Sequence, residues 1–163
     1  RVMNKLIERN LIESGYKASV IISGGGSSFI SNILKFPGAS EFVVDAQIPY
    51  SKEALFECLQ NKYPSFCNSF VATEMARIAY DRSVSLIKSK KKSLGIACTS
   101  ALKTNRKRQG SDRAYASILF EKTQYNRFFS IPLISRENQE SYLAQELLNY
   151  INDCLENYNA SIN

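Results

Sequence analysis

Histidine is absent from this chain of 163 residues, and its absence excludes several kinds of active site. Neither a Ser-His-Asp nor a Cys-His triad can form within the chain. A nucleophile here would have to be activated by lysine, tyrosine, a carboxylate or the backbone. The zinc sites that combine cysteine with histidine are excluded as well.

Cysteine is scarce, and the four cysteines that occur are scattered without a CxxC pair. This spacing does not favour a disulfide framework or a cysteine-only metal site. The sequence instead predicts free, partly buried thiols in a reducing cytosol, at Cys58, Cys67, Cys98 and Cys154. We therefore expect neither a metal site nor a cofactor.

Long apolar runs are missing too. No stretch approaches the roughly 20 residues that cross a bilayer, and the amino terminus carries no signal-peptide pattern. We expect a soluble, cytoplasmic protein without a membrane partner. Because the sequence begins at Arg1 rather than at a methionine, the possibility of a further domain upstream stays open.

The composition is otherwise that of a globular protein. A hydrophobic fraction of 44% and a charged fraction of 22% are ordinary, and nine tyrosines and nine phenylalanines argue against disorder. At this length we expect residues 1–163 to form a single domain. The sequence leaves the oligomeric state open, a homo-oligomer included.

Positive charge gathers in two short segments of a chain whose net charge is +6. KSKKK, residues 88–92, follows a long helical pattern, where cations near the last carbonyl groups are favourable. KTNRKR, residues 103–108, lies in a polar loop. Neither segment alternates with aromatic residues as a platform for single-stranded nucleic acid would. We therefore interpret both as solvated surface rather than as a nucleic-acid site.

The hydrophobic pattern divides the chain into helices and strands. It predicts helices over residues 2–15, 27–36, 52–62, 70–88 and 137–156, and strands over residues 17–23, 41–50, 93–100, 113–120 and 124–134. The expected core face of the helix over 70–88 comprises Val71, Met75, Ile78, Ala79 and Leu86. Strands that alternate with helices are typical of a three-layer α/β/α sandwich with a mostly parallel sheet. The last two strands add an antiparallel edge hairpin, because only three residues separate them.

Three consecutive glycines stand between the first predicted strand and the helix that follows it, in the stretch SGGGSS at residues 23–28. Glycine permits positive φ and a close approach of the backbone to a ligand. The unbonded N–H groups at the start of a helix attract anions. The stretch is neither a Walker A sequence nor GxGxxG, so a purely structural turn remains an alternative.

Hydroxyl groups mark several other strand ends or turns. Ser40 follows a Pro-Gly turn, Tyr50 follows the second strand, and Thr99 and Ser100 end the third. Ligands of open α/β sheets bind beyond the carboxyl ends of the strands. These hydroxyl groups could therefore converge on one pocket, although each of them alone is also typical of a cap or a turn.

Together, the stretches SGGGSSFISNILKFPGASEFVVDAQIPYS, FCNSFVATEMA and GIACTS resemble the C-terminal domain family of CinA, the competence/damage-inducible protein. Many members of this family are nicotinamide-nucleotide amidases. The resemblance covers about residues 1–100 by motif and the remainder by the order of elements. Gly38, Ala39 and Ser40 fall on the GSS of the family's PGSS motif, and Tyr50 falls on the tyrosine of YSNEAK. The triple glycine is similar to a divergent branch of the family that also occurs in plant proteins.

The resemblance implies an amidohydrolase that cleaves the carboxamide of nicotinamide mononucleotide or a related amide and releases ammonia. Ser40 would be the nucleophile, Tyr50 an activating or orienting group, and Thr99 a substrate contact. The substrate, a small phosphorylated nucleotide, would lie against a wall that comprises Ser23, Gly24, Gly25, Gly26, Ser27, Thr99 and Ser100.

The chain departs from the family pattern at three places, one of which is the ESCTGG segment, here ISGGGS without its acidic residue. Leu55 stands where the family has the lysine that activates the serine, and Lys52, three residues earlier, is the candidate substitute. The TGIAGP motif has become TSALKT and has lost both glycines. Two hypotheses follow: an amidohydrolase, degenerate or altered, or a non-catalytic nucleotide-binding or partner-interaction module of the same fold.

Overall fold

Five strands form a sheet in the order β2-β1-β3-β4-β5. The computed structural model describes residues 2–108 and 110–163, with side chains from residue 6 onward, so Arg1 lies outside the described residues. The strands are β1 (Lys17–Ser23), β2 (Val43–Gln47), β3 (Ser93–Ala101), β4 (Arg113–Leu119) and β5 (Gln124–Ser130). β1 pairs in parallel with both β2 and β3, whereas β4 and β5 add an antiparallel hairpin at one edge. The predicted sheet is confirmed.

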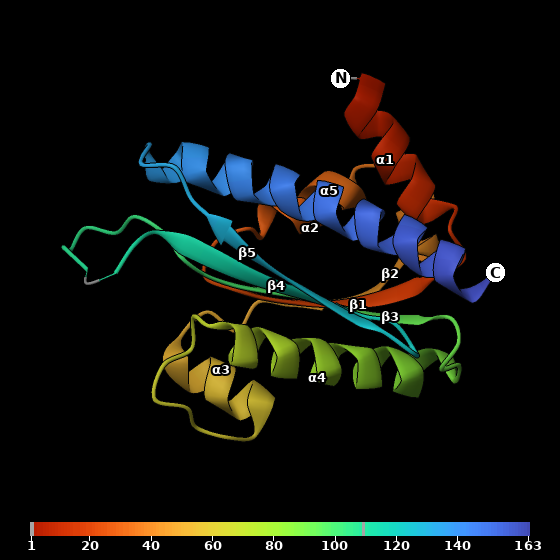
Figure 1. Ribbon diagram of the computed structural model, residues 1–163, viewed down its shortest axis with the longest axis horizontal. Coiled ribbons are helices and arrows are strands. Elements are labelled where there is room, and N and C mark those ends of the chain that lie inside the picture. The colour runs from red at the N-terminus through yellow and green to blue at the C-terminus, as the bar shows by residue number, and fades with distance from the viewer. Residues whose placement is uncertain (1, 109) are drawn as a thin grey trace.

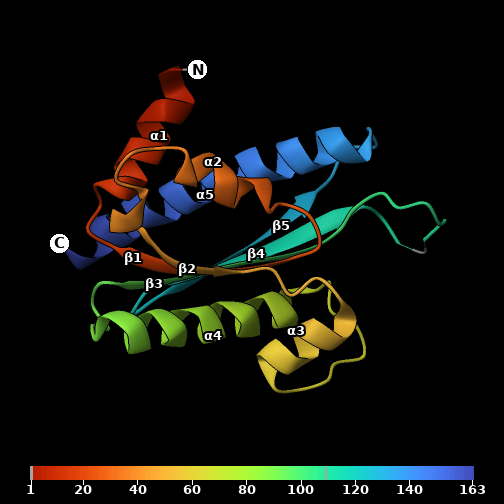
Figure 2. The same ribbon diagram turned by 180° about the vertical axis from the view of Figure 1, so that it is seen from behind.

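Helices cover both faces of this sheet (Figure 1). On one face lie α1 (Val2–Ile12), α2 (Ser28–Leu34) and α5 (Arg136–Ile162), and on the other lie α3 (Lys52–Leu59) and α4 (Ser69–Ile87). Figure 2 shows the same three layers from behind. The predicted α/β/α sandwich is therefore confirmed.

Each face of the sheet has its own apolar core, because successive side chains of a strand point to opposite faces. Val20 and Ile22 of β1 belong to the larger cluster, which α5 covers, whereas Ile21 packs under α3 and α4. β1 and β3 are buried on both faces, which explains their nearly continuous apolar sequences. Ligands can therefore approach these two strands only at their ends.

The buried side of α4 differs from the prediction at its last turn. Val71, Met75 and Ala79 are buried as expected, but Leu86 is 44% exposed. The buried row continues at spacings of four to Ser83, whose hydroxyl group donates a hydrogen bond of 2.7 Å to the carbonyl oxygen of Lys17. A serine bonded to the start of β1 thus takes the place that the sequence pattern assigned to leucine.

The last helix is longer than predicted and ends at Ile162. Its extra turns pack because Tyr158 is buried and stacks on Phe120, with ring centroids 4.3 Å apart. The polar residues between 156 and 162 concealed this contact in the sequence.

The four cysteines are free thiols, as predicted; three are buried and Cys58 is partly buried. Within the described part of the chain, no helix combines the length and the apolar character that crossing a membrane requires.

Candidate functional site

The carboxyl ends of β1 and β3 lie side by side, with Ser23 opposite Thr99 in the parallel register. The hydroxyl group of Ser23 donates to the carbonyl oxygen of Pro49 at 2.9 Å, and that of Thr99 donates to the carbonyl oxygen of Phe66 at 2.9 Å. Both side chains are buried. Their hydroxyl groups therefore tie strand ends to neighbouring loops.

The glycine loop after β1 lies directly against the end of β3. Gly24 and Gly26 have φ angles of +86° and +99°, which glycine adopts without strain. The N–H of Gly25 donates to the hydroxyl oxygen of Ser100 at 2.6 Å. A Cβ atom on Gly24 would collide with the carbonyl oxygen of Ser100. The close approach that these glycines permit is thus an approach to β3.

A carboxylate of the protein itself lies in the glycine loop. Glu140 of α5 accepts a hydrogen bond from the N–H of Gly26 at 2.7 Å through Oε1. Its Oε2 accepts from the N–H of Ser28 at 3.0 Å and from the hydroxyl group of Ser28 at 2.7 Å. The donors that the sequence suggested for a phosphate are therefore bonded to an internal anion.

Tyr50 and Lys52 lie at the same end of the sheet but contact different neighbours. Tyr50 is 65% exposed, and its hydroxyl oxygen accepts a hydrogen bond of 3.4 Å from Nη2 of Arg136. The ammonium group of Lys52 lies 5.9 Å from the ring centroid of Phe56, within reach of a cation–π contact. Among the described residues, no hydrogen bond or ion pair joins either side chain to the glycine loop or to Thr99.

Ser40 lies at the opposite end of the sheet. It belongs to the short 3₁₀ helix Ala39–Glu41, which precedes β2 and is held to the start of β1: Lys17 Nζ donates to the carbonyl oxygen of Glu41 at 2.7 Å. The five residues of β2, about 3.3 Å each, place roughly 16 Å of strand between Ser40 and Tyr50. The expected meeting of Ser40 with Tyr50, Lys52 and Thr99 therefore does not occur within one chain.

Leu55, which the motif resemblance aligns with a lysine, is fully buried. It packs with Ile21, Met75 and Ala97 in the core beneath α3 and α4. The side chain at position 55 therefore points into apolar surroundings.

Two thiols lie near the strand ends, and neither is a candidate nucleophile. Burial raises the pKa of Cys67, partly offset by Arg113 and Arg108. Burial is the main cause that raises the pKa of Cys98, and electrostatic interactions with Cys67 and Glu140 raise it further. Both therefore stay protonated at neutral pH, and a protonated thiol is a poor nucleophile. In the described ranges, no three His, Cys, Asp or Glu side chains group together to hold a metal ion.

Three residues of α5 that sequence reasoning missed organise this end of the sheet. Besides Glu140, Arg136 donates to the carbonyl oxygen of Lys103 at 2.8 Å. Gln139 is fully buried and accepts from the N–H of Lys103 at 2.8 Å. A polar first turn of a helix gives no local signal for such contacts, because their partners lie more than 30 residues away in the chain.

The contact between the glycine loop and β3 can be tested with a matched pair of variants. Gly24 and Gly15 have the same φ of +86°, but a Cβ atom on Gly15 would meet no atom within 4 Å. We expect Gly15→Ala to lower the free energy of unfolding by about 1 kcal/mol through backbone strain alone. Gly24→Ala should lower it by about 3 kcal/mol because the clash with Ser100 adds to that strain. Equal losses in urea unfolding would contradict the close approach.

The sequence matches no protein-family description and no curated protein, whereas solved structures match it closely in fold. A CinA superfamily protein of Klebsiella pneumoniae superimposes with a TM-score of 0.75 at 13% identity, covering 96% of this chain and 97% of that one. One from Escherichia coli gives 0.73 at 13% identity, covering 91% and 86%. The competence/damage inducible protein CihA from Agrobacterium tumefaciens gives 0.72 at 15% identity, covering 96% and 94%. The chain therefore has the CinA fold.

Proposed function

We propose that this chain is a non-catalytic module of the CinA fold that acts by binding a partner. The observation that carries the proposal is the side chain of Glu140, which occupies the hydrogen-bond donors of the glycine loop. An internal carboxylate in this place makes the loop a structural joint between β1 and α5.

A phosphate group could enter the glycine loop only by displacing Glu140. Hydrogen bonds to a charged group contribute about 1.5–3 kcal/mol each, and Glu140 accepts three of them. A carboxylate left beside the loop would also repel the incoming anion. These costs favour a loop that remains closed over a loop that binds a nucleotide.

Hydrolysis of an amide lacks support at two further positions. Leu55 is buried in the core, and Ser40 lies across the length of β2 from Tyr50. A serine without a nearby base loses a factor of about 10²–10⁴ in rate. Within one chain, the amidohydrolase hypothesis is therefore the weaker of the two, and a second copy would have to bring Ser40 to Tyr50.

The proposal predicts that the purified protein releases no ammonia from nicotinamide mononucleotide above the blank at micromolar protein concentration. Ammonia is measured by a coupled assay over several hours. Release that Ser40→Ala abolishes, while Ser85→Ala retains it, would overturn the proposal and would point to a site shared between two copies. Ser85 is the matched control because it is an exposed serine of α4 with no predicted role at the site.

A further inference from the structure

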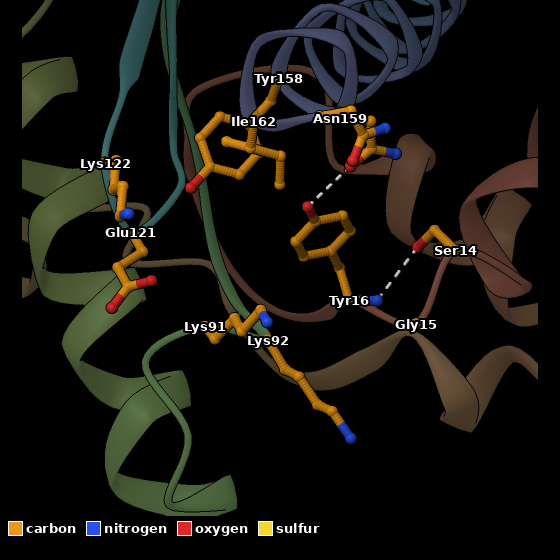
Figure 3. A pocket seen from close by; sticks show the side chains of 11 residues that line it. Ser14, Gly15, Tyr16, Lys91, Lys92, Glu121, Lys122, Tyr158, Asn159 and Ile162 are labelled. Carbon is orange, nitrogen blue, oxygen red and sulfur yellow. Dashed lines mark hydrogen bonds between the residues drawn. The ribbon is translucent and has the colours of Figure 1, made fainter.

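A cavity of about 580 Å³ lies at the end of the sheet opposite the glycine loop. It opens to solvent and is lined by residues 14–16, residues 91–92, the β4–β5 turn at residues 121–122 and the last turns of α5. The parallel strands β1 and β3 begin at this end, and antiparallel β4 returns to it. Figure 3 shows the four segments facing a common space, which we call the basic pocket.

The aromatic floor of the basic pocket is fixed. Tyr16 and Tyr158 are 9% and 3% exposed, and both rings contact Phe120, at centroid distances of 5.3 and 4.3 Å. The hydroxyl group of Tyr16 donates to Oδ1 of Asn159 at 2.8 Å, which joins the floor to α5 (Figure 3). The shape of the cavity therefore exists before any ligand arrives.

The segment that carries Lys91 and Lys92 is held in place as well. The hydroxyl group of Tyr80 donates to the carbonyl oxygen of Lys90 at 2.7 Å. The carbonyl oxygen of Lys92 accepts from the N–H of Lys17 at 2.8 Å. Hydrogen bonds to the carbonyl oxygens of Lys90 and Lys92 thus fix the main chain of this segment. Only the flexible side chains of Lys91 and Lys92 remain to be ordered when a ligand binds.

The side chains that line the basic pocket carry an excess of positive charge. Lys91 and Lys92 lie on one side and Lys122 lies on another, beside the pocket's one glutamate, Glu121 (Figure 3). Three lysines and one glutamate give these lining side chains a net charge of +2. Among the described residues, none of the three ammonium groups has an ion-pair partner. Apolar walls around charges of one sign strengthen the field inside a cavity.

We infer that the basic pocket binds a small phosphorylated molecule, with its phosphate group between Lys122 and the pair Lys91 and Lys92. Ammonium groups on flexible stems bind phosphate as point charges from several directions. The volume is within the range of roughly 300–1,000 Å³ that is usual for small-molecule sites. The inference is independent of the proposed function because the glycine loop lies at the other end of the sheet.

Isothermal titration calorimetry with inorganic pyrophosphate tests this inference on the intact chain. Saturable binding is expected, with Kd raised about 5-fold by Lys122→Ala and about 25-fold by the double change at Lys91 and Lys92. Glu121→Gln should lower Kd because it removes the pocket's repelling carboxylate. These side chains are exposed, so the melting temperatures of the variants should stay those of the parent protein.

Lys107→Ala is the matched control, because Lys107 is an exposed lysine in the other basic segment. Its Kd for pyrophosphate should stay within about 2-fold of the parent value. The inference is overturned if pyrophosphate gives no saturable heat below about 10 mM. It is also overturned if Lys107→Ala weakens binding as much as Lys122→Ala. A short oligonucleotide that binds more tightly than pyrophosphate and loses affinity with Lys107→Ala would mark a nucleic-acid surface instead.

Discussion

Glu140→Ala should lower the free energy of unfolding by about 3 kcal/mol. The substitution removes the acceptor of three hydrogen bonds from Gly26 and Ser28 and leaves partly buried donors of the glycine loop without a protein partner. In a chain of this length the melting temperature should fall by roughly 6–12 °C. Urea unfolding followed by circular dichroism measures the free energy, and a thermal scan measures the temperature.

Two further variants serve as controls for the stability of Glu140→Ala. Glu156→Ala, an exposed glutamate near the other end of α5, should change stability by less than about 0.5 kcal/mol. Glu140→Gln keeps the length of the side chain but places an amide donor against the loop, so its loss should lie between the other two. A Glu140→Ala variant as stable as Glu156→Ala would mean that Glu140 does not hold the glycine loop.

Leu55→Lys, which introduces the lysine that the motif resemblance aligns with this position, should destabilise the fold by about 4 kcal/mol and should not create amidase activity. Leu55 is completely buried among apolar side chains, where an ammonium group would lack both water and a counter-charge. The extent of unfolding in urea measures the loss, and the ammonia assay with nicotinamide mononucleotide measures activity.

Leu55→Met is the matched control for position 55. Methionine has nearly the volume of leucine and no charge, so this variant should lose less than about 1.5 kcal/mol. A Leu55→Lys variant that stays as stable as Leu55→Met and releases ammonia would contradict the account. It would show that the side chain at position 55 reaches the strand ends instead of the core.

The sheet and its layers could be predicted because their signals are local. The apolar strand β1, the glycines after it and the helical spacing of Phe29, Ile30 and Ile33 are contiguous in the sequence. The same holds for the hairpin of β4 and β5, which four residues connect. Where a prediction was wrong, as at Leu86, a polar residue had replaced an apolar one in the buried row of a helix.

The candidate site could not be predicted in the same way, because its decisive contacts join distant parts of the chain. Glu140 lies 112 and 114 residues after the loop residues that it binds, and a glutamate in a polar helix is inconspicuous. For Ser40 and Tyr50 the sequence misleads in the opposite way, because residues that are close in sequence lie far apart in the structure. They are only ten positions apart in sequence, but an extended strand lies between them and places them at opposite ends of the sheet.

The occupation of the glycine loop by Glu140 is tested most directly by titrating ¹⁵N-labelled protein with inorganic phosphate. In the parent protein the amide signals of Gly26 and Ser28 should not shift, because Glu140 already holds both N–H groups. In Glu140→Ala both signals should shift and saturate with phosphate. Shifts confined to residues 91, 92 and 122 report on binding in the basic pocket and do not bear on the glycine loop. A saturable shift of Gly26 and Ser28 together in the parent protein would contradict the closed loop and the proposed function built on it.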